Sequence, residues 1–109
     1  MITRIKISRS ATGLLAQKYN GLRSRLTPNL ILRNALTYSL NNNDKYNSEK
    51  IDTAGTEFQM STLLGSNSEL FFMLLCEYYG KKINDSEMKN IISFHIDCGL
   101  KSDDFLKIF

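Results

Sequence analysis

The residues of this sequence that could bind a metal or act as a nucleophile are few. His95 and Cys98 are three residues apart, a spacing that places both on one face of a helix, and Cys76 is the second of two cysteines. A structural zinc site needs four ligands, typically with a CxxC or HxxxH pair. Catalysis by Cys98 would need a third group to orient the histidine, and the sequence indicates none. We therefore expect these three side chains to be buried core residues, with no metal bound.

Patterns typical of nucleotide-dependent enzymes are missing as well. There is no Walker-type phosphate loop and no GxGxxG motif. Asp103 and Asp104 are adjacent and close to the C-terminus, which favours solvated charges over acid–base catalysis. We expect a chain that is not an enzyme by itself and that carries no cofactor.

Basic residues are concentrated in the first part of the chain. Residues 1–43 contain seven lysines and arginines, including all five arginines, and no acid, whereas residues 44–109 contain seven lysines against eleven acids. Arginine binds phosphate well because its planar fork donates two parallel hydrogen bonds. This asymmetry favours a polyanionic partner, either nucleic acid or an anionic membrane surface. The alternative is a solvated basic face that pairs with the acidic half.

Length and composition indicate one soluble domain, residues 1–109. Hydrophobic residues make up 42% and charged residues 23%, as in ordinary globular proteins. No apolar run approaches the roughly 20 residues of a membrane-spanning helix. The N-terminal residues MITRIKISRS have no apolar signal region, so we expect a cytoplasmic protein.

The elements that must position the basic residues begin with a strand. Residues 2–8 alternate, so Ile5 and Ile7 should face a core while Arg4, Lys6 and Ser8 face outward. No hairpin mate lies nearby in the sequence. We therefore expect this strand to pair with another chain or to lie as an arm.

Two helices should follow, the first from Ser10 to about Arg25. The second begins with Thr27 as N-cap and Pro28 at the first helical position. Its first turn has no acid and is flanked by Arg25 and Arg33, which predicts an open phosphate-binding helix start. Its apolar residues cover so much of the circumference that we expect burial against more than its own chain.

The second half is also predicted to be helical. Residues 41–55 read as a polar loop, and residues 56–65 fit either a helix or a strand. A capping box at Ser66 and Glu69 starts a helix that ends at Gly80. A second box at Asn84 and Glu87 starts a helix that stops near Gly99. The apolar tail, residues 101–109, is a candidate subunit contact. The expected fold is therefore mainly α, a compact domain of four to five helices with a basic strand–helix–helix half (1–43), a helical half (56–100) and the tail.

The order strand, helix, turn, helix in residues 2–40 resembles the ribbon–helix–helix class of DNA-binding modules. In that class two chains pair their strands and insert them into the major groove, and a helix N-terminus binds a phosphate. Here the resemblance implies that Arg4, Lys6 and Ser8 face the groove and that Thr27–Asn29 grips the phosphate.

A second resemblance covers most of the chain, from Ile5 to Leu100. LTPNLILRNALTYSL (26–40), GTEFQMSTLLG (55–65) and a closing helix that ends in HIDCGL are similar to the DndE family. DndE is the small subunit of the bacterial DNA phosphorothioation system, which replaces a non-bridging phosphate oxygen with sulfur. The resemblance implies a non-catalytic, mainly helical subunit that assembles as a homotetramer, binds DNA and favours nicked duplex. It further implies partners: a cysteine desulfurase, an iron–sulfur subunit and an ATPase.

Three hypotheses about function stand side by side. The first is a subunit that binds the DNA backbone without reading bases. The second is a ribbon–helix–helix regulator that prefers one duplex sequence, and the third is an adaptor whose basic half binds an acidic protein surface. For the first hypothesis the expected DNA contacts are Arg4, Lys6, Arg9, Lys18, Arg23, Arg25, Thr27, Asn29 and Arg33.

Overall fold

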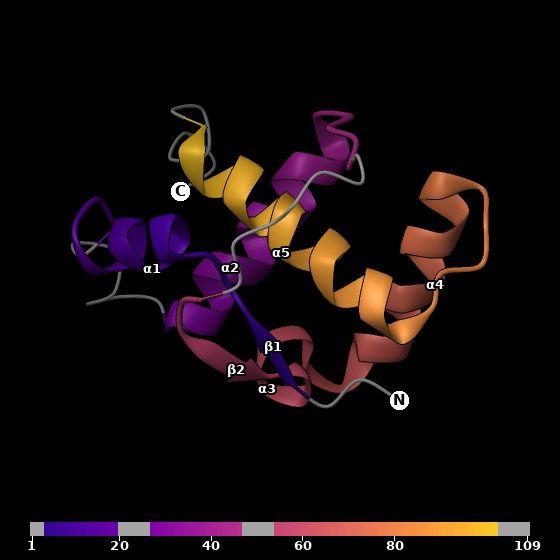
Figure 1. The fold of residues 1–109 in the computed structure, drawn as a ribbon, viewed down its shortest axis with the longest axis horizontal. Helices are drawn as coiled ribbons and strands as arrows, with labels where there is room; N and C mark the ends of the chain where they lie inside the picture. The colour runs from indigo at the N-terminus through magenta and orange to yellow at the C-terminus, as the bar shows by residue number, and fades with distance from the viewer. Residues whose placement is uncertain (1–3, 20–26, 47–53, 103–109) are drawn as a thin grey trace.

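The computed structural model describes residues 4–19, 27–46 and 54–102, and within them the fold is mainly α with a short N-terminal strand, as predicted (Figure 1). No helix in these three ranges is both long and apolar enough to cross a bilayer. Arg23 and Arg25, both predicted DNA contacts, fall outside them. The elements in chain order are β1 (Arg4–Lys6), α1 (Arg9–Ala16), α2 (Pro28–Asn41), β2 (Glu57–Gln59), α3 (Met60–Leu64), the 3-10 helix η2 (Gly65–Asn67), α4 (Ser68–Tyr79) and α5 (Asp85–Lys101).

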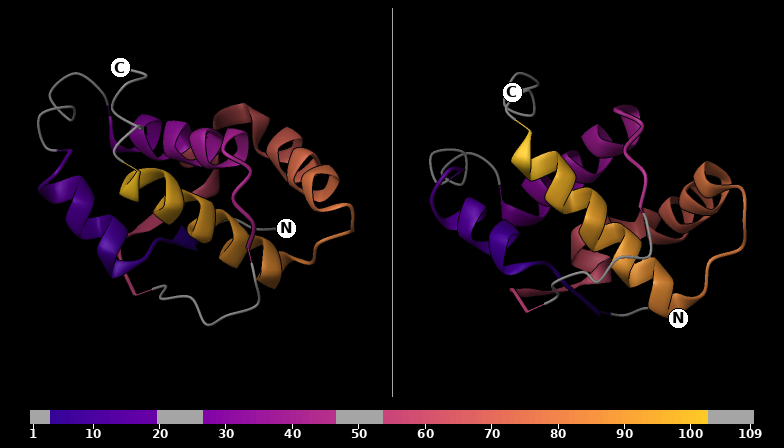
Figure 2. Two further views of the ribbon diagram at one scale, coloured as in Figure 1. Left: turned by 90° about the horizontal axis from the view of Figure 1, so that it is seen from above. Right: turned by 45° about the horizontal axis from the view of Figure 1, so that its top comes forward.

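Helix α5 is the central element, and it packs against α2, α1 and β1. Figure 2 shows α5 lying across α2 in both views. At the crossing, a Cβ built on Gly99 would lie 2.1 Å from the carbonyl oxygen of Ala35. The helix was predicted to stop near Gly99, and α5 ends close to it, at Lys101. The glycine is therefore required for a close helix–helix approach and is not a C-cap.

The core lies between α5, α2 and α3. On α2, Ile31, Leu32, Ala35 and Leu36 are fully buried, as are Ile91, Ile92, Ile96 and Leu100 on α5. We predicted that α2 is buried against more than its own chain. Its own chain already buries these residues, because α5 and α3 both pack on α2.

Strand β1 has a partner in its own chain, so the prediction of pairing with another chain was wrong. It pairs antiparallel with β2, with Ile5 opposite Phe58. The backbone of Ile7 extends the pairing by a bond to the Thr56 carbonyl at 3.1 Å. Residues 56–65, which fitted either a helix or a strand, are both: β2 runs directly into α3.

Ile5 and Ile7 are buried as predicted, but Ser8 is buried as well and does not face outward. Ser8 is the N-cap of α1: its hydroxyl oxygen accepts from the backbone N–H of Ala11 at 2.9 Å and its O–H donates to Asp97 on α5. The residue thereby joins the helix start to the central helix.

The first helix is much shorter than predicted. It ends at Ala16, not near Arg25, and residues 17–19 form a turn in which the Tyr19 N–H donates to the Leu14 carbonyl at 2.9 Å. This turn directs Tyr19 into the core, where its hydroxyl donates to the carbonyl oxygen of Leu100. Burial of one large aromatic ring outweighs the continuing helical pattern of the sequence.

Of the two predicted capping boxes one is confirmed in its N-cap half. Asn84 caps α5 and accepts from the N–H of Glu87 at 2.8 Å, while the Glu87 carboxylate accepts from Lys81. Ser66 lies inside η2, and α4 begins only at Ser68, so the other box does not form. Gly80 ends α4 in the left-handed conformation (φ 66°), as predicted.

Helix α4 exposes an apolar surface at one end of the molecule (Figure 1). Leu70, Met73 and Leu74 are 52%, 68% and 48% exposed, and Leu75 is its buried residue. Single exposed apolar residues are common on soluble proteins, but three on one helix form a patch.

Candidate nucleic-acid interface

The outward face of β1 carries two of the predicted DNA contacts. Arg4 and Lys6 are exposed on either side of buried Ile5, so the strand displays both cations on one face. Arg4 Nη1 lies 3.4 Å from Glu57 Oε2 on β2, and both side chains are well exposed (62% and 43%). An exposed pair of this kind is weak, worth about 0–1 kcal/mol, so Arg4 can exchange it for another anion.

Two further predicted contacts lie in or just after α1. Arg9 is exposed in the first turn of α1. Lys18 is exposed in the turn after α1, with its Nζ 5.5 Å from the centre of the Tyr19 ring. Both cations therefore remain at the surface.

The start of α2 is built as predicted, but its side chains have partners within the chain. Thr27 is the N-cap and Pro28 the first helical residue, and Thr27 makes no side-chain cap bond. The side-chain amide of Asn29 donates to the Thr62 carbonyl at 3.1 Å. Arg33 Nε donates to the Leu63 carbonyl at 2.8 Å.

These carbonyls belong to the last turn of α3, where unpaired backbone oxygens carry partial negative charge. Arg33 therefore caps the C-terminal end of α3 and does not lie open beside the start of α2. An arginine can therefore follow a first turn of α2 that has no acid, because the charge of Arg33 lies at the end of α3 and not at the start of α2. That Asn29 and Arg33 also contact DNA stays a prediction.

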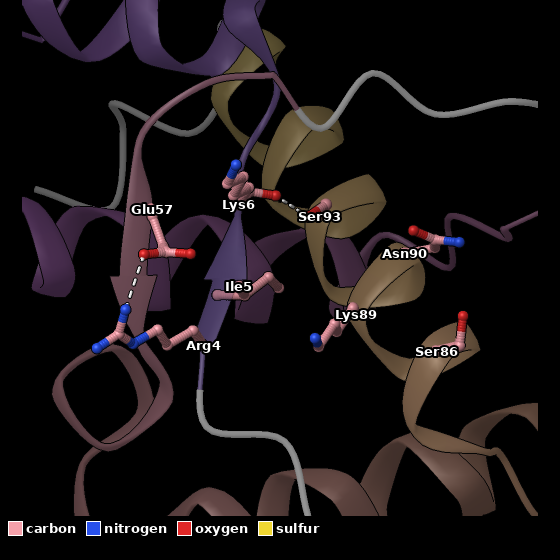
Figure 3. A pocket seen from close by; sticks show the side chains of 8 residues that line it. All are labelled: Arg4, Ile5, Lys6, Glu57, Ser86, Lys89, Asn90 and Ser93. Carbon is pink, nitrogen blue, oxygen red and sulfur yellow. Dashed lines mark hydrogen bonds and ion pairs between the residues drawn. The ribbon is translucent and has the colours of Figure 1, made fainter.

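A polar cavity lies between β1 and the first half of α5 (Figure 3). Its volume is about 260 Å³. Figure 3 shows Lys89 reaching from α5 towards β1, while the Ser93 hydroxyl donates to the Lys6 carbonyl at 2.7 Å. Lys89 lies in the acidic half of the sequence, so the charge count gave no reason to select it. The lining residues are Arg4, Ile5, Lys6, Glu57, Ser86, Lys89, Asn90 and Ser93.

The single histidine is part of a buried hydrogen-bonded chain. The Ser39 hydroxyl donates to the Asp44 carboxylate at 2.9 Å and lies 2.8 Å from His95 Nδ1. Since the serine proton goes to the carboxylate, Nδ1 is the protonated nitrogen and donates to Ser39. Nε2 then accepts from the Tyr79 hydroxyl, whose oxygen accepts from the Tyr46 N–H at 2.9 Å.

This arrangement holds His95 neutral. Burial is the main cause that lowers the pKa of His95 to about 4, and nearby Asp44 opposes the change in part. Burial likewise raises the pKa of the Tyr79 hydroxyl to about 12. Both shifts favour the neutral groups that the hydrogen-bonded chain requires.

The metal and nucleophile candidates are His95, Cys76 and Cys98. In the described ranges no group of three or more His, Cys, Asp or Glu side chains could hold a metal ion. His95 is buried as expected, whereas Cys76 and Cys98 are half-buried. Burial and the neighbouring acids Asp44 and Asp97 raise the pKa of the Cys98 thiol, which disfavours a thiolate nucleophile.

Comparison with known proteins identifies relatives of one kind. Residues 4–104 match the model of a family described as DNA sulphur modification protein DndE. The fold is similar to the crystal structure of DndE from Escherichia coli B7A, which is involved in DNA phosphorothioation modification: the TM-score is 0.79 at 19% identity, over 94% of this chain and 99% of that one. The crystal structure of a mutant DndE involved in DNA phosphorothioation is also similar: the TM-score is 0.71 at 20% identity, over 92% of this chain and 94% of that one. The comparison with curated proteins gives no significant match.

Proposed function

Because the chain belongs to the DndE family, we propose that it is a non-catalytic, DNA-binding subunit of the phosphorothioation machinery. It binds the phosphate backbone of duplex DNA, intact or nicked, as a homo-oligomer in the cytoplasm. The other phosphorothioation subunits are its protein partners: a cysteine desulfurase, an iron–sulfur subunit and an ATPase.

The observation that carries DNA binding is the fixed display of cations at the N-terminal end. Arg4 and Lys6 share one face of β1, and Arg9 follows in the first turn of α1. The pairing of β1 with β2 and its contact with α5 hold this face rigid. Cations on a rigid strand contact successive phosphates without ordering a loop, and such contacts position a protein without reading bases.

A non-catalytic role is supported by the state of the nucleophile and acid–base candidates. His95 is buried and has partners on both ring nitrogens. The Cys98 thiol is half-buried and its pKa is raised. Neither group is available to abstract a proton from a substrate or attack it at neutral pH.

Self-association is supported by α4. One hollow beside this helix, of about 420 Å³, is lined mainly by apolar side chains such as Phe72, Met73 and Met88. Another, of about 570 Å³, includes Leu40, Phe71 and Leu74. Together with the exposed Leu70, Met73 and Leu74 they form a surface that a second copy of the chain would cover. Assembly would multiply a modest DNA affinity per subunit by avidity.

The ribbon–helix–helix alternative is not favoured, because β1 is already paired with β2 and the Lys6 carbonyl is bonded to Ser93. A strand in this position does not form a ribbon with another chain. The adaptor hypothesis is an outcome of the test below.

The test is binding of the purified protein to intact, nicked and single-stranded DNA by fluorescence anisotropy at several salt concentrations, with its mass measured in solution. We expect log affinity to fall linearly with log salt. The double variant Arg4→Gln, Lys6→Gln should lower both the affinity and the slope. The matched control is Lys45→Gln, Lys101→Gln, which removes the same charge from exposed positions elsewhere. Binding to partner subunits but to no DNA would support the adaptor and overturn the proposal.

A further inference from the structure

We propose that the cavity between β1 and α5 is a binding site for one phosphoryl group of the DNA backbone, held by Lys6 and Lys89 with Arg4 at its rim. This inference rests on the proposed function, and it selects one site among the exposed cations. It also names a contact residue, Lys89, that lies in the acidic half of the sequence.

The two lysines are presented by different elements whose spacing is fixed. Lys6 lies on β1 and Lys89 on α5, and the Ser93 hydroxyl joins these elements by its bond to the Lys6 carbonyl at 2.7 Å. Buried Ile5 packs between them in the core. The separation of the two backbone positions is therefore set by the fold and not by loop motion, so only the lysine side chains have to be ordered when an anion binds between them.

The charge balance of the lining favours an anion. Three cations face one carboxylate, Glu57, which is paired with Arg4 at 3.4 Å. Among the described residues, Lys6 and Lys89 have no side-chain hydrogen bond or ion pair. The nearby acid Glu87 is bonded to Lys81 at 2.9 Å. Two lysines without a counter-ion on either side of one cavity repel each other, and an anion between them removes that repulsion.

The size of the cavity limits what can enter. At about 260 Å³ it is several times the roughly 30 Å³ that one water occupies in the liquid. It is smaller than the roughly 300–1,000 Å³ typical of pockets for cofactors and drug-sized ligands. One phosphoryl group with some of its water fits this range.

The remaining lining groups suit phosphate oxygens. Ser86 and Asn90 lie on one face of α5 with Lys89, at helical steps of three and four, while the proton of the nearby Ser93 hydroxyl is already donated to the Lys6 carbonyl. Hydroxyl and amide groups donate hydrogen bonds to phosphate oxygens. They can bind the oxygens that a lysine ammonium, which is a compact point charge, does not reach.

The experiment combines DNA binding with a probe that does not need DNA. Affinity for a short duplex of mixed sequence is measured between about 50 and 200 mM salt for the wild type, Lys89→Gln, Lys89→Arg and the control Lys101→Gln, an exposed position on the same helix. Thermal melting verifies that each variant is folded. We expect Lys89→Gln to weaken binding about threefold to tenfold and to reduce the salt slope by about one, while Lys89→Arg and Lys101→Gln stay near the wild type.

In parallel, inorganic phosphate is titrated into the labelled wild-type protein while amide NMR shifts are recorded, with chloride at equal ionic strength as the control. Saturable shifts at Ser86, Lys89 and Asn90 are expected. If the wild type binds DNA but Lys89→Gln has the same affinity and salt slope as Lys101→Gln, the cavity is not the phosphate site and the proposed function stands. If the amides respond to phosphate but no DNA binds, the site takes a free phosphate and the proposed function fails. If neither response occurs, both proposals are overturned.

Discussion

Arg33 on α2 donates from Nε to the carbonyl oxygen of Leu63, 30 residues further along the chain, at 2.8 Å. Its Nη2 also lies 3.4 Å from the Thr62 carbonyl, to which Asn29 donates. The guanidinium of Arg33 and the amide of Asn29, both on α2, therefore donate to the carbonyl oxygens at the end of α3. The adjoining Gly65 has a positive φ of 67°, which L side chains rarely adopt, so the chain turns sharply beside the guanidinium.

Replacing Arg33 should reduce stability more than DNA binding. In Arg33→Ala the carbonyls of Thr62 and Leu63 lose their charged donor, and we expect the free energy of unfolding to fall by about 1–2 kcal/mol. Urea denaturation measures this change. Thr37→Ala on the same helix, an exposed position, is the matched control. An undiminished stability together with a lower salt slope for DNA binding would instead assign Arg33 to the phosphate backbone.

The helix crossing at Gly99 should tolerate no side chain. Gly99→Ala places a Cβ 2.1 Å from the Ala35 carbonyl oxygen, which forces α5 and α2 apart, and we expect a loss of about 1–3 kcal/mol. Gly13→Ala in α1 is the control because no atom lies within 4 Å of the new Cβ. It should stabilise the protein by up to about 1 kcal/mol through helix propensity. Equal melting temperatures for the two variants would contradict the close approach.

Protonation of His95 should destabilise the fold. Its pKa is about 4 in the folded chain and about 6.5 in the unfolded chain, so the unfolded state binds a proton first as pH falls. The stabilisation is complete above pH 6.5 and is lost between 6.5 and about 4, a total of about 3 kcal/mol. Urea denaturation across this range measures it.

Substitution of His95 provides the control for that titration. His95→Gln loses the buried ring that contacts Ser39 and Tyr79, so the variant should be less stable than the wild type at pH 7. Because glutamine does not ionise, the variant should also lose this part of the pH dependence of stability. An NMR titration that places the His95 pKa near 6.5 in the folded protein would contradict the buried, neutral assignment.

The exposed face of α4 should determine the mass in solution. Met73→Glu adds a charge to its most exposed apolar residue, at 68% exposure, and we expect the oligomer to dissociate. Ser61→Glu, exposed on α3, adds the same charge elsewhere and should leave the mass unchanged. Sedimentation equilibrium distinguishes the monomer from the oligomer. If Met73→Glu leaves the oligomer unaltered, the subunit interface lies on another surface.

Local patterns predicted much of this fold. Thr27–Pro28, Asn84 and Gly80 each mark a helix boundary because capping depends on residues adjacent in sequence. The alternation around Ile5 correctly gave a strand with Arg4 outward. These signals concern contacts within a few residues, where the backbone geometry is fixed.

The errors arose where a distant contact decided the structure. The mate of β1 lies about 50 residues away, and nothing local to residues 4–6 specifies it. Tyr19 ends α1 early because the core accepts its ring next to Leu100. Lys89 was missed because its counterpart Lys6 is brought close only by tertiary folding, although its helical spacing with Ser86 and Ser93 is visible in the sequence.

The pairing of β1 also affects the order of folding during synthesis. Arg4 and Lys6 precede their partners in the chain, so their strand has no mate until Glu57–Gln59 is synthesised and no bond to α5 until Ser93 follows. Contacts of such long sequence separation form late because the intervening chain must first be ordered. The basic strand is thus synthesised before the elements that hold it, and a nascent chain cannot present this folded surface before its central helix exists.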